Sequence, residues 1–486
     1  MSENLNICLI NDSFPPEIDG VANAVTNYAT IITREHGKVT VVTPYNAKAD
    51  DSGFDFPVLR YPSVDMTRLV GYHAGFPFSP EVQRKLMAEG FDLIHSHCPI
   101  TSTILARSLR DRIDVPIVLT YHTKFDIDIA NAVSSKLLQE QAKKLLAENI
   151  SACDEVWTVS RGAGENLRSL GYKGDYIVMP NGVDFPQGRV GDTLIAEVTG
   201  AYDLPAGVPV FLFVGRMMWY KGIRIILDAL KLLADAGKDF RMVFVGGGGD
   251  KREIVACAEK LALCDRVFFV EPIHDRNLIR AWYCRADLFL FPSTFDTNGL
   301  VVREAAACAL PSVLIAGSCA AEDVEDGVSG FLIEENADSM AAKLTVLCRE
   351  PEAVRAVGEN ALRTLYLSWE DAVANACRRY GTVIENYRAG LYTKHTSLTA
   401  DLIHSIAQSL EGYNRSRDYQ KAKMQELSDG YRRLYGQLVE GGQKRLTDLQ
   451  DAQNRVSVDL RAEEEQHTAE LMHKFDELTW FLDRFM

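Results

Sequence analysis

The sequence predicts an α/β protein in which two doubly wound domains face a cleft and a helical extension follows. Short apolar runs alternate with helical patterns along most of the chain, which is typical of parallel sheets covered by helices. A glycine-bearing turn joins a strand to a helix early in each half, where open α/β sheets bind their ligands. The length of 486 residues is enough for more than one hydrophobic core.

The composition excludes several classes of protein. With 47% hydrophobic and 24% charged residues the chain resembles an ordinary globular protein. The formal net charge of -15 disfavours nucleic acid held by bulk charge, although a local basic patch stays compatible with it. The 10 cysteines include no Cys-x-x-Cys pair, so we expect free buried thiols and no zinc site. Without a signal peptide or a run of roughly 20 apolar residues, a cytoplasmic location is expected.

The first domain is expected over residues 1–190. Its strands are expected at residues 5–10, 38–43, 57–60, 92–97, 116–122, 154–160 and 176–179. Pro15 and Pro16 exclude helix just after the first strand, Gly20 frees the turn, and a helix is expected over residues 21–34. This strand, glycine turn and helix is a weak signal alone, but its place after the first strand favours a binding role.

Two segments of this domain are candidates for contact with a partner. Residues 71–80 are apolar and aromatic and too irregular for a strand or a helix. They either pack on the core or form an exposed surface for an acceptor. Lys136, Lys143 and Lys144 share an expected helix with several leucines. That helix either rests on an anionic membrane or presents an ordinary solvated face.

Two patterns in the first domain resemble metal sites. His95 and His97 lie two apart at a strand end and therefore on one face, as a metal pair or as polar groups facing the crevice. Asp126 and Asp128 form an Asp-x-Asp pattern that in other proteins holds a divalent cation under a diphosphate. Because this pattern lies well past the strand end, we expect no metal ligand here.

The second domain is expected over residues 200–368, after a polar linker. Its strands are expected at residues 210–214, 242–245, 267–270, 287–292 and 327–333. Arg216 follows the first of these strands and Lys221 marks a helix start, so both cations can converge on a diphosphate. The glycines at 246–249 suit close approach to a nucleotide. They lack the full dinucleotide fingerprint, which disfavours an oxidoreductase.

Residues 287–311 organise the second domain. They read as a buried strand, a polar turn and a helix over residues 300–310 that Pro311 ends. Asp296 lies in the turn, and Glu304 follows after seven intervening residues, about two helical turns on. Both carboxylates can therefore face one cleft. Amides at the helix start form an expected anion site. The residues that supply these amides are Asn298, Gly299, Leu300 and Val301.

The same residues carry a resemblance to a known family. FPS, an acidic residue and NGLVVREAAACALPSV resemble the signature of the family 4 retaining glycosyltransferases of GT-B fold. The family pattern has two glutamates separated by seven residues, and Asp296 stands where the first is usual. VGR followed by KG, which contains Arg216 and Lys221, is similar to the family's diphosphate-binding pair. The resemblance covers residues 5–388.

The resemblance implies a nucleotide-sugar donor, with UDP-glucose or a similar UDP-hexose expected, and transfer with retention. Arg216 and Lys221 would take the charge of the leaving diphosphate, so no cofactor and no metal ion are expected. Asp296 would lie against the donor sugar, and Glu304 would hold the ribose hydroxyls.

The resemblance also implies roles in the first domain. His122 falls where the family has a cleft histidine and is expected to contact the sugar. Gly20 is expected near the donor phosphates, with Asp19 facing the acceptor or solvent. The aromatic loop and the basic helix resemble glycosyltransferases that modify diacylglycerol, which predicts a lipid acceptor and a peripheral place at the inner membrane face. The alternative is a non-catalytic scaffold that binds a sugar nucleotide and acts through its tail.

The last part of the chain differs from the rest. A helix over residues 369–390 is expected to cross back to the first domain, as in GT-B proteins. Residues 391–486 contain no proline, and their apolar residues recur at steps of three and four. The residues that make these stripes are Leu427, Tyr431, Leu434, Leu438, Leu471, Phe475, Leu478 and Leu482. This coiled-coil-like extension either pairs two subunits, packs on its own body or docks on a membrane or partner.

Overall fold

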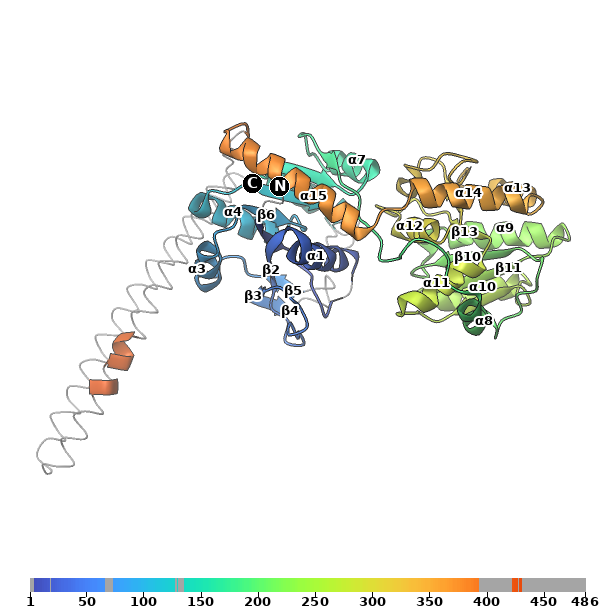
Figure 1. Cartoon of the computed structure of the whole chain (residues 1–486), viewed down its shortest axis with the longest axis horizontal. Coiled ribbons are helices and arrows are strands. Elements are labelled where there is room, and N and C mark those ends of the chain that lie inside the picture. Colours follow the sequence, from blue (N-terminus) through green and yellow to red (C-terminus); the bar gives the residue numbers. More distant parts are fainter. Residues whose placement is uncertain are drawn as a thin grey trace, which may run out of the picture. The chain divides into compact units, whose positions relative to one another are not determined.

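The computed structural model describes residues 4–17, 19–65, 73–126, 129, 135–392, 422–426 and 428–430. Two large parallel sheets, one in each half of the chain, confirm the predicted α/β class (Figure 1). Both sheets have helices on their faces, and their strands are buried, as parallel strands are when helices cover both sides.

The first sheet has seven strands in the order β3-β2-β1-β6-β7-β8-β9, all of them parallel. They are β1 (Leu5–Ile10), β2 (Gly37–Pro44), β3 (Val58–Tyr61), β6 (Leu93–Ser96), β7 (Ile117–Tyr121), β8 (Glu155–Thr158) and β9 (Ile177–Val178). The helices of this half are α1 (Gly20–Ile31), α3 (Pro80–Ala88), α4 (Thr101–Ile113), α6 (Lys136–Ser151) and α7 (Arg161–Ser169).

Helix α1 starts where the sequence places it, but its first residues behave differently from the prediction. The Asp19 carboxylate accepts hydrogen bonds from the amides of Val21 at 2.8 Å and Ala22 at 2.7 Å. Asp19 is therefore the N-cap of this helix, and it stays exposed, as an orientation toward solvent predicts. The α-helix ends at Ile31, and a short π-helical segment, Ile32–His36, continues to β2.

Part of the stretch predicted as an irregular aromatic loop is regular. A small antiparallel pair joins β4 (Ser63–Asp65) to β5 (His73–Gly75), and α3 begins at Pro80. The prediction of irregular structure is therefore wrong for these residues, because cross-strand pairing gives them a conformation that their own pattern does not specify. Residues 71 and 72 lie outside the described residues.

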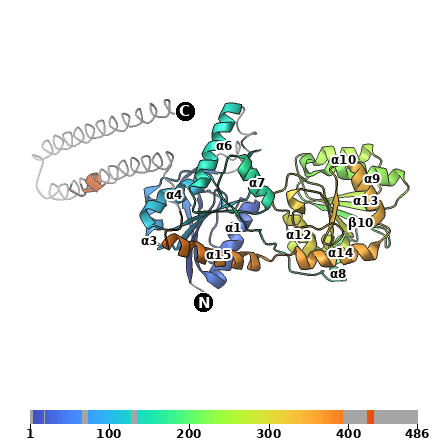
Figure 2. The same ribbon diagram turned by 90° about the horizontal axis from the view of Figure 1, so that it is seen from above.

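The second sheet has six parallel strands in the order β12-β11-β10-β13-β14-β15. They are β10 (Val210–Val214), β11 (Arg241–Val245), β12 (Val267–Val270), β13 (Leu288–Phe291), β14 (Ser312–Ile315) and β15 (Phe331–Ile333). The helices around it are α8 (Asp192–Thr199), α9 (Ile223–Asp235), α10 (Lys251–Lys260), α11 (Arg276–Arg285), α12 (Leu300–Ala307), α13 (Ala337–Leu347) and α14 (Pro351–Thr364). Helix α9 packs beside α13 (Figure 2), and α11 packs beside α8 (Figure 1).

Three segments near the boundaries of the two domains each pack on one of the two cores. Val183 and Phe185 are buried in the core of the second sheet, and so is Ile195 of α8, within the stretch predicted as a linker. Helix α15 (Trp369–Arg388) instead contributes Trp369 and Tyr380 to the core around the first sheet, where it lies beside α1 (Figure 1). Burial of their apolar side chains thus holds each of these segments against one of the two cores.

Of the extension, residues 391–392, 422–426 and 428–430 are described, and the last two of these stretches are helical. The predicted stripe residues Leu427, Tyr431 and those after them lie outside the described residues. Among the helices that the structure describes, none combines the length and the apolar character that crossing a bilayer requires.

Candidate active site

Each sheet has a point where successive strands leave in opposite directions. Strand β10 lies between β11 and β13, and β1 lies between β2 and β6. Ligands of open α/β sheets bind beyond the carboxyl ends of the strands at such points. The predicted diphosphate cations follow β10, and the predicted acidic turn follows β13, so adjacent strands bring the two together.

Lys221 and Asp296 form the direct contact between these two loops. Their Nζ and Oδ2 atoms are 2.9 Å apart, and the side chains are only 13% and 19% exposed. Asp296 Oδ1 also accepts hydrogen bonds from the amides of Asn298 at 3.2 Å and Gly299 at 2.7 Å. Burial opposes the charged carboxylate, but Lys221 and the two amides outweigh burial and lower the pKa of Asp296. The structure therefore holds Asp296 as an anion.

Positive groups remain available beside this pair. Arg216 is exposed, and its guanidinium has no polar partner among the residues that the structure describes. In the described chain the amides of Leu300 and Val301, at the first turn of α12, likewise have no acceptor. The free guanidinium follows β10, and the two free amides open the helix after the adjacent strand β13, so all three suit a phosphate group.

Glu304 lies one turn into α12, and its carboxylate accepts hydrogen bonds from two side chains of the same domain. Its Oε1 accepts from Arg276 at 2.6 Å, its Oε2 accepts from the Tyr283 hydroxyl at 2.9 Å, and its side chain is 12% exposed. The Arg276 guanidinium also lies 4.3 Å from the centre of the Phe185 ring. Burial and Glu304 together raise the pKa of Tyr283, which stays a hydrogen-bond donor. A ribose at Glu304 would have to share it with Arg276.

Glycines allow these loops to come close together. A Cβ on Gly222 would lie 1.8 Å from the carbonyl oxygen of Pro292, so no other residue fits between the Lys221 and Asp296 loops. Gly246 and Gly248 belong to the glycine run that was predicted to approach a nucleotide. A Cβ there would meet Gly215 O at 2.1 Å and Met217 O at 2.3 Å. These two glycines therefore pack against the Arg216 loop itself.

In the first domain, His122 follows β7 and lies in a cluster of buried histidines. Its Nε2 is 3.0 Å from His97 Nδ1, and burial lowers the pKa of His122 to about 3. The nitrogens of His95 contact the Tyr380 hydroxyl at 2.5 Å and Thr120 Oγ1 at 2.7 Å. Within the described ranges, no group of three His, Cys, Asp or Glu side chains is arranged to hold a metal ion.

Gly20 and Asp126, two other residues singled out in the sequence, have few contacts among the described residues. Gly20 is the first residue of α1, and a Cβ on it would have nothing within 4 Å. This leaves room for a ligand at the helix start. The Asp126 carboxylate accepts a hydrogen bond from Asn166 Nδ2 at 3.1 Å. Asp128, its partner in the Asp-x-Asp pattern, lies outside the described residues.

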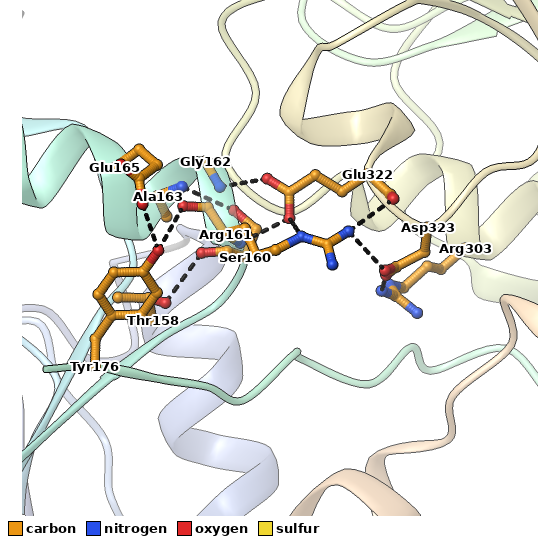
Figure 3. Close-up of polar contacts among 10 residues, drawn as sticks. All are labelled: Thr158, Ser160, Arg161, Gly162, Ala163, Glu165, Tyr176, Arg303, Glu322 and Asp323. Carbon is orange, nitrogen blue, oxygen red and sulfur yellow. Dashed lines mark hydrogen bonds and ion pairs between the residues drawn. The ribbon is translucent and has the colours of Figure 1, made fainter.

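A polar junction joins α7 of the first domain to the loop after β14 (Figure 3). Glu322 points at the N-terminus of α7, where it accepts hydrogen bonds from the amides of Arg161, at 2.6 Å, and Gly162. The Arg161 guanidinium lies against Glu322 and 3.9 Å from Asp323, which Arg303 also contacts at 2.8 Å. A carboxylate at a helix start is stabilised by the free amides and the helix dipole.

This junction borders a cavity of about 140 Å³. Asn298 lines the cavity together with Arg161, Arg303 and Glu322. Asn298 is buried, and neither its amide nitrogen nor its amide oxygen has a partner among the described residues. An unpaired buried amide beside the predicted sugar-binding loop indicates that a bound polar group satisfies it.

Several of these residues carry no signal in the sequence. Arg276 opens α11 after a loop that matches no motif, and its contact with Glu304 depends on how α11 packs. Glu322 lies beyond the acidic turn and reaches a helix more than 150 positions earlier in the chain. His97 is recognisable only as a polar group at a strand end, and its partner His122 comes from the neighbouring strand.

Comparison with known proteins adds family relations to this geometry. The model described as "Glycosyl transferases group 1" matches residues 197–364, and the model "Glycosyltransferase Family 4" matches residues 18–186. The two matched ranges correspond to the two sheet domains.

This chain matches only part of the length of two curated relatives. A D-inositol 3-phosphate glycosyltransferase of Xylanimonas cellulosilytica is 31% identical over 258 residues, which are 50% of this chain and 60% of that relative. An alpha-monoglucosyldiacylglycerol synthase of Streptococcus pneumoniae is 22% identical over 356 residues, which are 72% of this chain and 79% of that relative.

Solved structures share the fold. Sucrose-phosphate synthase from Thermosynechococcus elongatus has a TM-score of 0.62 and 21% identity, over 78% of this chain and 99% of the other. HepE from Anabaena, in complex with UDP and glucose, has a TM-score of 0.60 and 18% identity, over 78% of this chain and 100% of the other.

Proposed function

The chain belongs to the family 4 glycosyltransferases of GT-B fold, and from this premise we propose that it transfers a hexose from a UDP-sugar to a hydroxyl acceptor with retention. One observation carries the proposal. Arg216 and the amides of Leu300 and Val301 have no partner among the described residues, and they follow the same two adjacent strands as the paired Lys221 and Asp296. That arrangement suits a diphosphate whose charge rises as its bond to the sugar breaks.

The proposed step breaks the bond between the anomeric carbon and the β-phosphate oxygen. A bond from the acceptor oxygen to the same carbon forms, and the acceptor proton passes to the leaving diphosphate. Arg216 and Lys221 neutralise that leaving group, so the reaction needs no metal ion in this proposal. Asp296 and the Asn298 amide orient the sugar, and Glu304 holds the ribose.

A UDP-hexose is the donor that best fits what is known of similar proteins. HepE of Anabaena, a fold neighbour, is described in complex with UDP and glucose. The names of the two curated relatives specify glycosyl transfer but differ in the acceptor, inositol 3-phosphate in one and a diacylglycerol lipid in the other.

For the acceptor we propose a diacylglycerol-type lipid. Helix α6 leaves Leu137 70% exposed and Leu145 54% exposed, next to the exposed Lys136 and Lys144. Two exposed leucines, each beside an exposed lysine, suit a surface that rests on an anionic bilayer. This also supports a peripheral place at the cytoplasmic side of a membrane.

The test is incubation of the full chain with UDP-glucose and vesicles that contain diacylglycerol and an anionic lipid. The expected product is an α-linked glucolipid, formed equally well with a chelator present, and NMR of its anomeric proton reports the configuration. Parallel reactions with inositol 3-phosphate test the other acceptor. A glucosylated inositol phosphate without any glucolipid would refute the lipid proposal, and a β-linked product would refute retention.

The alternative is a scaffold that binds a sugar nucleotide without turnover. Slow hydrolysis of UDP-glucose without acceptor distinguishes the two, because an enzyme releases UDP and a scaffold does not. Arg216→Ala and Glu304→Ala should abolish this release. Arg349→Ala, which changes an exposed arginine between α13 and α14, should not. A wild-type protein that binds UDP-glucose but releases no UDP would favour the scaffold.

A further inference from the structure

The histidine cluster beside β6 and β7 contains an unusual nitrogen-to-nitrogen contact. His97 Nδ1 and His122 Nε2 are 3.0 Å apart, and the two rings are nearly parallel, with 22° between their planes. His97 Nε2 is buried without a partner, whereas His122 Nδ1 is not among the buried unpaired atoms. Since His122 makes no other polar contact among the described residues, its Nδ1 keeps access to solvent or ligand.

The two imidazoles share one proton in this contact. Burial lowers the pKa of His122 to about 3, and burial with the neighbouring histidines lowers the pKa of His97 well below its usual range. Both rings are therefore neutral near pH 7, and each carries a proton on one nitrogen only. At 3.0 Å one of the two facing nitrogens donates and the other accepts.

The surroundings decide which ring donates. If His122 donated from Nε2, the proton of His97 would lie on Nε2, as a buried N–H without an acceptor. If His97 donates from Nδ1, its buried Nε2 is a bare acceptor, and the proton of His122 lies on Nδ1. Orphaned buried donors are rarer in proteins than unsatisfied acceptors, so the second arrangement is favoured.

We propose that His97 is a positioning residue that fixes the tautomer of His122, so that His122 presents an Nδ1–H donor to the sugar or the acceptor and does not act as a base. The part of this proposal that concerns substrate rests on the proposed glycosyl transfer. The tautomer itself follows from the contact of the two rings and stands apart from that activity.

Packing holds His97 in this role. The ring of His95 lies 4.0 Å from that of His97, and the ring of Tyr28 lies 5.3 Å away. His95 is fixed in turn because both of its nitrogens are bonded, one to Tyr380 of α15 and one to Thr120 of β7. Helix α15 thus supports the histidine that supports His122.

The first experiment reads the tautomer directly. Long-range nitrogen–proton correlation NMR of the full chain, with His122→Asn to assign the signal, shows which ring nitrogen carries the proton. The proposal expects Nδ1–H for His122 in the wild type. A proton on Nε2, or a charged ring at pH 7, would overturn it. Arg349→Ala, at an exposed position between α13 and α14, should leave the His122 signal unchanged.

The second experiment uses two substitutions of nearly equal shape. His97→Asn keeps a donor toward His122 Nε2, whereas His97→Asp offers a carboxylate that accepts and should move the His122 proton to Nε2. We expect kcat to fall about tenfold or more in His97→Asp relative to His97→Asn, with a similar KM for the donor. Equal kcat values for the two variants, when the spectra show different tautomers, would refute the positioning role.

The two measurements separate the inference from the proposed function. If His97→Asp fails to fold, as melting curves would show, the wild-type and His97→Asn spectra still decide the tautomer. A wild-type protein with the Nδ1 tautomer but without glycosyl transfer would refute the proposed function and leave the tautomer assignment standing.

Discussion

Asp296 holds the lysine that, in the proposed function, binds the donor diphosphate. Lys221 Nζ is 2.9 Å from Asp296 Oδ2, and Asp296 Oδ1 occupies two amides at the start of the α12 loop. A diphosphate that binds here therefore competes with Asp296 for the same positive groups. In the proposed function, binding of the diphosphate would free the Asp296 carboxylate to contact the sugar.

This exchange predicts a large effect of Asp296→Asn. The amide keeps the shape but loses the charge that holds Lys221, so we expect kcat/KM for UDP-glucose to fall roughly 100-fold or more. Asp296→Glu, which restores the longer side chain of the family, should lose about tenfold at most. Steady-state kinetics measure both, with Asp265→Asn at a 72% exposed position as the control. Similar losses for the Asn and Glu variants would contradict the argument.

At the scale of elements, the spacing between β10 and β13 depends on one glycine. Gly222 has a φ of 78°, and a Cβ there would come 1.8 Å from Pro292 O. Gly222→Ala should therefore lower the free energy of unfolding by about 3 kcal/mol or more and separate Lys221 from Asp296. Gly237→Ala is the matched control, because φ is 67° there but nothing lies within 4 Å. It should cost only about 1 kcal/mol of backbone strain. Equal losses in urea unfolding would show that contact with Pro292 is unimportant.

The start of α7 depends on a carboxylate from the other domain. Glu322→Gln keeps one acceptor but removes the charge beside the Arg161 and Gly162 amides, which should destabilise the contact by about 1 kcal/mol. Hydrogen exchange is the sensitive measurement, and those two amides should exchange several-fold faster in the variant. Glu165→Gln, on the exposed side of the same helix, should leave their rates unchanged. Unchanged rates in Glu322→Gln would mean that the junction opens freely in solution.

At the scale of the whole molecule, the sequence is a good guide to strands and turns. The strands at residues 5–10, 210–214 and 267–270 lie where the apolar runs predict them, because a parallel strand buries both faces and leaves a continuous apolar pattern. The end of α12 was predicted at residue 310 but comes at Ala307. Ala309 adopts a φ of 56° and ends the helix before Pro311 does.

Contacts between distant segments could not be predicted in this way. The sequence indicates Glu304 and His122 as site residues but not their partners, Arg276 and His97, which come from neighbouring elements. Asp19 is exposed, as an orientation toward solvent predicts, but its role as the cap of its own helix was not predicted. Hydrogen-bond partners depend on packing, and a local pattern carries no information about packing at a distance.

The buried histidines predict how the stability of the molecule depends on pH. The pKa values of His95, His97 and His122 are all lowered by burial, so each ring is neutral in the fold but takes up a proton on unfolding below pH 6.5. The unfolded chain then binds more protons than the folded chain, and the free energy of unfolding falls as the pH falls. Between pH 6.5 and 5.5 the loss should be roughly 1 kcal/mol for each histidine, about 3 kcal/mol in total.

Urea unfolding at pH 7.5, 6.5 and 5.5 tests this prediction, with the fluorescence of the buried Trp157, 5.0 Å from His95, as a probe near the cluster. His97→Asn removes one of the three titrating rings, so its stability should depend on pH about one third less steeply than that of the wild type. Stability that stays constant from pH 7.5 to 5.5 would mean that the cluster is already charged in the fold. A charged cluster would in turn remove the neutral tautomer on which the role of His97 depends.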